Sequence, residues 1–197
     1  MRKIGCAMSF AVSAAFCSIL SSLAAAQAVP TASRGLDISA FGGLTGNYTG
    51  LASGRNLDIT AGIDHGFKPF LSWYPSLESR GSYPVYGGTV DRQKNILGGV
   101  KLSRFYGRLH PYGDVLFGRG KINYIHRFAT PDPNFHYVRS VSNVFAFGGG
   151  IDFALSTHLL LKADGQFERY STPATSSGHL FSKPITGGVV YRFSFGR

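Results

Sequence analysis

The sequence predicts an all-β fold: an eight-stranded antiparallel transmembrane β-barrel preceded by a cleavable signal peptide. First, Arg2 and Lys3 lead into an apolar Ser/Ala-rich stretch, which is typical of a secretory signal. Second, residues 185–195 alternate with a period of two, which is typical of a strand whose faces meet different surroundings. Third, no later apolar run approaches the ~18–20 residues of a membrane-spanning helix.

The apolar N-terminal stretch ends in a small-x-small motif at residues 26–28, which predicts signal cleavage after Ala28. We therefore divide the chain into a signal peptide (1–28), an N-terminal lead-in (29–35) and a β-barrel domain (36–197). This domain is long enough for eight membrane strands of about ten residues each, together with their connections. Cys6 and Cys17 both lie in the signal, so the mature chain is expected to have no cysteine.

Eight segments are expected to form the strands, with long and short connections alternating between them. The strands are expected at residues 36–44, 56–64, 70–80, 91–103, 112–121, 140–155, 158–170 and 185–195. Long loops are expected at 45–55, 81–90, 122–139 and 171–184, and short turns near Phe67, Tyr106 and Ser156. An even number of antiparallel strands brings both chain ends to the side of the short turns.

The second and third segments differ in the clarity of their alternation. In the second, apolar residues at 57, 59, 61 and 63 alternate with two aspartates, a threonine and a glycine. In the third, Trp73 and Leu77 share a face opposite Glu78. Pro75 weakens this pattern because it cannot donate a ladder hydrogen bond.

The fourth and fifth segments contain one ambiguity of register. Ile96, Val100 and Leu102 share one face of the fourth segment. Lys94 and Lys101 fall on opposite faces, which leaves the register near the start of this strand open. In the fifth segment, positions 115 and 117 are apolar and the intervening position 114 is an aspartate on the opposite face.

The last three segments have the most regular patterns. The sixth carries apolar residues or glycine at 145, 147, 149, 151 and 153, with Asp152 on the other face. The seventh alternates apolar residues or glycine over 159–167 with Lys162, Asp164 and Glu168. In the eighth, every second residue from Ile185 faces one way and Arg192 faces the other.

The two faces of these strands predict two environments. The apolar face is expected to meet lipid at Ile59, Ile63, Val100, Phe117, Phe147, Ile151, Leu161, Val189 and Tyr191. Charged residues on the inner face are expected to form ion pairs, because an isolated charge in a narrow interior is costly. These candidates are Asp58, Asp64, Lys101, Asp114, Asp152, Lys162, Asp164, Glu168 and Arg192. A proton or ion path along these groups is the alternative interpretation.

The span from Leu36 to Phe195 resembles the small bacterial outer-membrane β-barrel family of OmpA-type and OmpX-type eight-stranded barrels, porin-family-like outer membrane proteins. The resemblance rests on the signal, the alternation, and the segments 110–120 and 190–195. It implies an outer-membrane location, contact with outer-membrane lipid and lipopolysaccharide, and insertion by the barrel assembly machinery. It also implies a terminal assembly signal among Tyr191, Phe193 and Phe195, although two further residues follow Phe195.

The function expected from this resemblance is structural or interactive, with four loops presented around an interior filled by side chains. A small-solute or ion pore is one alternative, but wide aqueous channels need about 16 strands. A lipid A-modifying enzyme is the second, and its serine nucleophile would need a positioned histidine base. No histidine in the sequence is followed by serine two residues later, although distant loops could assemble such a site. We predict no catalytic, cofactor or metal site.

The charge of the chain indicates anionic surroundings without selecting one partner. Removing Arg2 and Lys3 from the formal charge of +10 leaves +8, which favours lipopolysaccharide phosphates or surface polymers; no motif indicates nucleic acid. The third long loop combines basic with aromatic residues. This combination is typical either of a site for lipid phosphates, sugars or a protein partner, or of an aromatic girdle beneath a solvated basic loop. The residues are Lys121, His126, Arg127, His136 and Arg139, with Tyr124, Phe128, Phe135 and Tyr137. A soluble secreted all-β domain is the alternative to the barrel.

Overall fold

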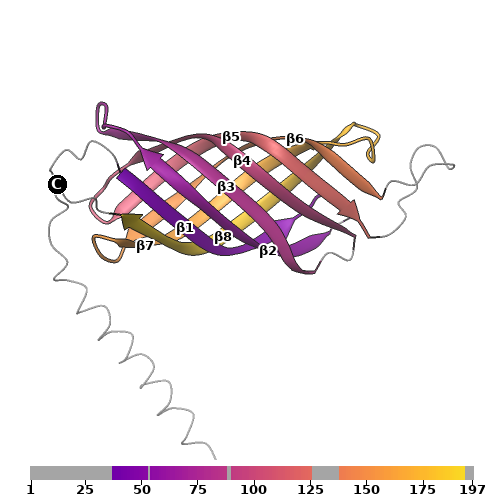
Figure 1. Cartoon of the computed structure of the whole chain (residues 1–197), viewed down its shortest axis with the longest axis horizontal. Helices are drawn as coiled ribbons and strands as arrows, with labels where there is room; N and C mark the ends of the chain where they lie inside the picture. Colours follow the sequence, from indigo (N-terminus) through magenta and orange to yellow (C-terminus); the bar gives the residue numbers. More distant parts are fainter. Residues whose placement is uncertain (1–36, 53, 88–89, 126–137, 194–197) are drawn as a thin grey trace, which may run out of the picture. The chain divides into compact units, whose positions relative to one another are not determined.

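A computed structural model describes residues 37–52, 54–87, 90–125 and 138–193, which form a closed antiparallel barrel of eight strands (Figure 1). They lie within one compact unit, Ser33–Arg197. The predicted signal peptide, its cleavage site, the lead-in and Phe195 lie outside these residues. The strands are β1 (Asp37–Tyr48), β2 (Arg55–Gly66), β3 (Trp73–Gly87), β4 (Asp91–Arg104), β5 (Leu109–Tyr124), β6 (Arg139–Ala154), β7 (Leu159–Ser171) and β8 (His179–Phe193).

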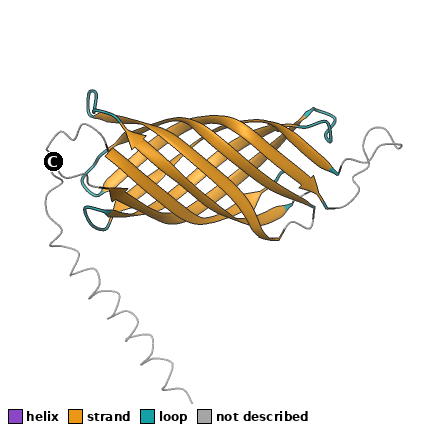
Figure 2. Ribbon diagram, in the orientation of Figure 1, coloured by secondary structure: helices purple, strands orange, loops and turns teal. Residues whose placement is uncertain are grey.

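Each strand pairs with its neighbours in sequence, and the pairing of β1 with β8 closes the barrel (Figure 2). Ile38 lies opposite Phe193, and Tyr48 lies opposite Lys183. Closure removes the unpaired strand edges that would otherwise recruit another chain. Within the described part of the chain, no helix is long and apolar enough to cross a membrane.

The two ends of the barrel differ in their connections. The turn end, at the left of Figure 1, carries the connections 67–72, 105–108 and 155–158, together with the start of β1 and the end of β8. The loop end carries the connections 49–54, 88–90, 125–138 and 172–178. The connections alternate between the two ends in the predicted order, but their lengths follow the prediction only in part, because the three residues between β3 and β4 are fewer than the six between β2 and β3.

The strand boundaries differ from the predicted ones, mainly at the loop end. β1 continues to Tyr48, β3 continues to Gly87, and β8 already begins at His179. The outward positions of these extensions mix glycine and basic residues with exposed hydrophobic ones such as Tyr48, Tyr83 and Phe181, so a regular apolar face does not reveal them. β3 also starts three residues later than predicted, because Leu71 and Ser72 have positive φ angles of 48° and 66°. They form the two-residue turn of a hairpin closed by the Phe70–Trp73 bridge.

The predicted alternation of faces is confirmed along all eight strands. All nine residues predicted to face lipid lie exposed on the outer surface. The ambiguous start of β4 resolves simply, because Lys94 faces outward and Lys101 inward without a break in the alternation. Pro75 lies within β3 near the turn end, where its carbonyl accepts a hydrogen bond of 2.9 Å from the Phe67 amide.

Candidate functional site

The interior of the barrel is the first candidate site, because it gathers nearly all the acidic groups of the chain. Polar and charged side chains outnumber hydrophobic ones among the buried residues described. Eight of the nine predicted ion-pair candidates are buried there, and Arg192 lies partly exposed at the turn end. Hydrogen bonds and ion pairs divide these groups into three layers along the barrel.

The central layer is organised around Arg80, which projects from β3 and is 4% exposed. Its Nη2 atom donates to Asp164 Oδ1 at 2.8 Å, and its Nη1 atom lies 3.4 Å from Glu78 Oε1. The Tyr112 hydroxyl donates to the other Asp164 oxygen at 2.8 Å, and the Gln166 amide donates to both oxygens of Asp114 at 2.9 Å. One guanidinium thus faces several carboxylates, a geometry to which its planar fork is suited.

The layer nearer the turn end contains two buried lysines. Lys101 Nζ lies 2.9 Å from Asp64 and 3.3 Å from Asp152, and Lys162 Nζ lies 3.7 Å from the second oxygen of Asp152. Both ammonium groups also lie over the Tyr112 ring, at 4.0 and 4.2 Å from its centroid. The aromatic ring lies close to both lysines and offers each a cation–π contact.

The layer nearer the loop end holds its acids with neutral donors. Asp58 accepts from Asn47, and Glu168 accepts from Asn95 at 3.0 Å and from the Tyr170 hydroxyl at 2.9 Å. Among the described residues, neither acid has an ion-pair partner within 4 Å. The structure therefore brings Asp64, Lys101, Asp152 and Lys162 into one cluster, and Asp114 and Asp164 into the Arg80 cluster, while Asp58 and Glu168 lie apart.

A hydrophobic cluster also occupies the interior, on the side of β4–β8 toward the loop end. Leu116, Ile122 and Val144 are fully buried, and Tyr170 packs among them. Glycines on the inner face of β6 leave the space that large neighbours fill: a Cβ at Gly150 would lie 2.6 Å from the Tyr112 hydroxyl. The interior is consequently packed with side chains, as expected for eight strands.

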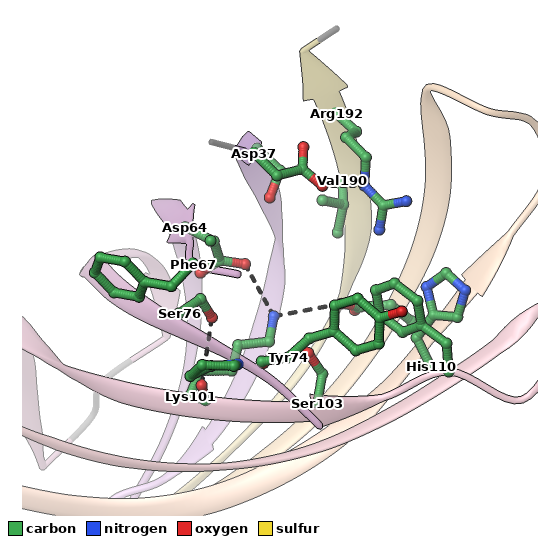
Figure 3. Close-up of a pocket in the computed structure, with 15 residues that line it drawn as sticks. Asp37, Asp64, Phe67, Tyr74, Ser76, Lys101, Ser103, His110, Val190 and Arg192 are labelled. Carbon is green, nitrogen blue, oxygen red and sulfur yellow. Dashed lines mark hydrogen bonds and ion pairs between the residues drawn. The ribbon is translucent and has the colours of Figure 1, made fainter. Parts of the chain in front are cut away.

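A small pocket opens at the turn end, with a volume of about 70 Å³ (Figure 3). Lys101 reaches across it to Asp64 and Asp152, and Arg192 Nε lies 3.5 Å from Asp37 Oδ2. The rings of Tyr74 and Phe105 stack at 3.9 Å, and the His110 ring stacks on Phe105 at 4.1 Å. The pocket has room for a few water molecules rather than for a lipid or sugar.

The four histidines that the structure describes make structural contacts. His110 stacks on Phe105 and lies 3.3 Å from the Gly107 carbonyl, while His158 lies 3.2 Å from the Arg192 carbonyl. His65 packs against Phe67, and His179 contacts Arg169. Across the described residues, no group of three or more His, Cys, Asp or Glu side chains has the geometry of a metal site.

The outer surface is the second candidate site, and its charge differs from that of the interior. Every aspartate and glutamate on the described strands faces the interior, apart from Asp37 at the turn end. Basic residues instead face outward near the loop end on most of the strands. They are Arg55, Arg92, Lys94, Arg119, Lys121, Arg139, Arg169 and Lys183. Below them, toward the turn end, the outer surface is largely apolar, and Arg104 at the end of β4 lies over the rings of Trp73 and Tyr106.

Sequence reasoning missed Arg80 and Glu78 as charged interior residues. The signal for them was the alternation of Leu77 with Ser76 and Glu78, which Pro75 obscured. It also missed the inward-facing hydrophobic cluster, since alternation alone assigns Leu116 and Val144 to the inner face without saying that they pack together. Of the basic-aromatic residues predicted in the third loop, Lys121, Tyr124 and Arg139 lie at strand ends, and the other six lie outside the described residues.

No protein-family model and no curated protein sequence matches the chain. Among solved structures, it is similar to Neisserial surface protein A, with a TM-score of 0.51 and 11% identity over 82% of this chain and 99% of that one. It also matches Ail, the attachment invasion locus protein of Yersinia pestis, in complex with the heparin analogue sucrose octasulfate (TM-score 0.48, 14% identity, 80% and 97% covered). A third match is the outer membrane enzyme PagL (TM-score 0.44, 12% identity, 81% and 99% covered).

The likeness to Neisserial surface protein A concerns the fold, because only 11% of the aligned residues are identical. It agrees with the pairing of the eight strands and with the closure of β1 on β8. The chain therefore has the fold of a small eight-stranded outer-membrane barrel, as the sequence resemblance predicted.

Proposed function

We propose that this chain is an integral protein of the bacterial outer membrane, with a closed barrel that spans the bilayer and presents its loops to the surroundings. The observation that carries this proposal is the inverted distribution of its side chains. Large apolar residues such as Ile151 and Phe117 are about half exposed on the outer surface, whereas carboxylates fill the interior. In water such a surface would be unfavourable, whereas in hydrocarbon it is the required one.

The height of the apolar surface supports a transmembrane position. On β5, the outward-facing residues are apolar or glycine from Leu109 to Phe117, and basic or polar from Arg119 onward. Eight steps along a strand span about 26 Å, or roughly 20 Å along the axis of a barrel with a tilt of ~40°. This height is close to the ~25 Å apolar band of outer-membrane barrels.

The flanks of the apolar band support an orientation with the turn end in the periplasm. Exposed aromatic residues lie toward both ends, as in the two interfacial girdles of membrane barrels. Those near the turn end are Phe67, Trp73, Tyr106, Tyr191 and Phe193, and those toward the loop end are Tyr48, Tyr83, Tyr86 and Phe181. The loop end carries most of the outward-facing basic residues and the longest connection, which joins β5 to β6. Outer-membrane barrels place their short turns in the periplasm and their longer loops outside the cell. To reach the outer membrane, the protein requires export by the predicted signal peptide and insertion by the barrel assembly machinery.

We further propose a non-catalytic role in scaffolding and surface interaction. The packing of the interior supports this role rather than that of an open pore, since Arg80, Tyr112 and Leu116 occupy its cross-section. The contacts of His110 and His158 with aromatic rings and backbone carbonyls support a structural use of these histidines rather than that of a catalytic base.

Membrane fractionation with heat-modifiability on a gel tests the location and the closed barrel together. We expect the protein in the outer-membrane fraction and a band that shifts when the detergent sample is boiled. A freely soluble periplasmic band without a shift would contradict the proposal. Planar-bilayer recording of the purified protein then tests the closed interior, and a steady stepwise conductance would favour the pore instead.

A further inference from the structure

A groove of about 410 Å³ lies on the outer surface of β3–β6, toward the loop end. Its basic residues are Lys94 on β4 and Arg119 and Lys121 on β5. Its apolar wall includes Ile96 and Val141, which are 72% and 50% exposed. The groove therefore combines three cations with hydrophobic surface at the level where the apolar band ends.

The three cations occupy neighbouring outward-facing positions on β4 and β5. Lys94 is directly opposite Lys121 in the β4–β5 pair, and Arg119 is the next outward-facing residue along β5, opposite Ile96. Like charges directly opposite one another on a sheet are destabilising. Lys94 Nζ also lies over the Tyr83 ring, 5.4 Å from its centroid, at the β3 side of the groove.

No carboxylate on the described outer surface of these strands balances the three cations. Glu78, Asp91, Asp114 and Asp152, the acidic residues of β3–β6, are all buried. The ion pairs of Glu78 and Asp114 are with Arg80, on the inner side of the sheet. The arrangement is thus complementary to an anion that arrives from outside the chain.

We propose that this groove binds the phosphorylated headgroup of lipopolysaccharide, lipid A, with a phosphate held by Lys94, Arg119 and Lys121 and an acyl chain lying against Ile96 and Val141. This inference rests on the proposed function, because the loop end then lies in the outer leaflet where lipopolysaccharide resides. The combination of adjacent cations with exposed apolar surface fits an amphiphilic phosphate better than a free inorganic anion. The absence of a side chain at Gly81 keeps the β3 side of the groove open: a Cβ there would be 3.9 Å from Ile96.

The first test measures the binding of bisphosphorylated lipid A to the detergent-extracted full-length protein. The triple variant Lys94→Gln/Arg119→Gln/Lys121→Gln should weaken binding by at least roughly tenfold, because each basic group near an anionic surface contributes attraction. The matched control is Arg55→Gln/Arg169→Gln/Lys183→Gln, which removes three outward cations of the loop end outside β3–β6. It should weaken binding less than threefold. Equal losses in both variants, or no loss in either, would overturn the proposed site.

A second pair of variants tests the shape of the groove without changing its charge. Gly81→Leu should fill the groove and weaken lipid A binding by roughly tenfold, since a Cβ at this position meets no atom closer than 3.5 Å and the fold should tolerate it. Gly46→Leu, on β1 where a Cβ meets nothing within 4 Å, is the control and should bind normally. Normal binding by Gly81→Leu would show that lipid A does not occupy the groove.

Two further lipids identify the headgroup. Dephosphorylated lipid A should bind the wild-type protein at least roughly tenfold more weakly, and phosphatidylglycerol in the same micelles should also bind more weakly. Equal binding of either lipid would contradict the assignment to the lipid A phosphates. Heat-modifiability of every variant checks that the barrel is folded. A wild-type protein found outside the outer membrane would refute the proposed function itself, whereas a correctly located barrel with unselective lipid binding would refute only this inference.

Discussion

At the scale of single residues, Arg80 forms ion pairs with three buried carboxylates, more than any other described cation in the interior. Its guanidinium faces Asp164, Glu78 and Asp114, and its side chain is almost completely buried. Removing the cation from a buried cluster of ion pairs leaves its carboxylates buried without a compensating charge. This costs more free energy than the ion pairs themselves contribute to stability. The structure thus makes Arg80 more critical for stability than any exposed basic residue.

We expect Arg80→Ala to lower the free energy of unfolding by about 3–5 kcal/mol. Urea titration of the protein refolded into lipid vesicles, followed by tryptophan fluorescence and gel shift, measures this change. Arg169→Ala is the control, because Arg169 is exposed on the outer surface and its polar contact is with His179; it should change the free energy by no more than about 0.5 kcal/mol. A change of less than about 1 kcal/mol for Arg80→Ala would show that the central carboxylates are stabilised in another way.

At the scale of the strands, β6 depends on its inner-face glycines. A Cβ at Gly150 would collide with the Ala163 carbonyl and with the Tyr112 hydroxyl. Gly165, on the neighbouring strand β7, has no atom within 4 Å of such a Cβ. The two strands therefore respond differently to the same substitution although they lie side by side.

Gly150→Ala should destabilise the barrel by about 1–3 kcal/mol through overpacking. Gly165→Ala should be neutral or stabilising by up to about 1 kcal/mol, because it restricts only the unfolded chain. Parallel urea titrations compare the two variants. The packing described for the β6–β7 interface would be wrong if they proved equally stable.

The strands also show what the sequence can predict. Period-two alternation identifies all eight, because lipid-facing residues such as Leu161 and Val189 recur at every second position. The alternation loses its contrast where β1, β3 and β8 extend toward the loop end, so their boundaries cannot be read from it. The pairs of interior side chains that contact each other are harder still to predict from the sequence. The contact of Arg80 with Asp164 joins β3 to β7 and depends on the register of every strand between them.

At the scale of the whole molecule, charge is sorted between the two sides of one sheet. Carboxylates face the interior, where they contact buried cations and neutral donors, and basic groups face outward at the loop end. Between these basic groups and the aromatic residues at the turn end, the outward-facing residues of the described strands are apolar or glycine with few exceptions, such as Ser79 on β3. This surface is the property on which the proposed membrane location depends.

Ile151→Lys tests that location, because it introduces a charge within the apolar band on β6. A lysine between the middle of this band and its turn-end edge should cost about 1–3 kcal/mol and reduce the amount of folded protein in the outer membrane. Val138→Lys at the loop end, where the side chain is 73% exposed, should cost at most about 1 kcal/mol. Quantifying the heat-modifiable band in membrane fractions compares them. Normal assembly of Ile151→Lys would exclude this surface from the hydrocarbon.

The closure of β1 on β8 has a consequence for the order of events during folding. The hydroxyl groups of Thr45 and Thr186 meet at 2.8 Å although 141 positions separate them in the chain. A contact of such long range forms late, because closing so long a loop costs chain entropy before the contact can stabilise the fold. Until β8 arrives, β1 and β7 each expose an unpaired edge. We therefore expect an incomplete chain of this protein to be exposed to proteolysis and aggregation until its final strand is available.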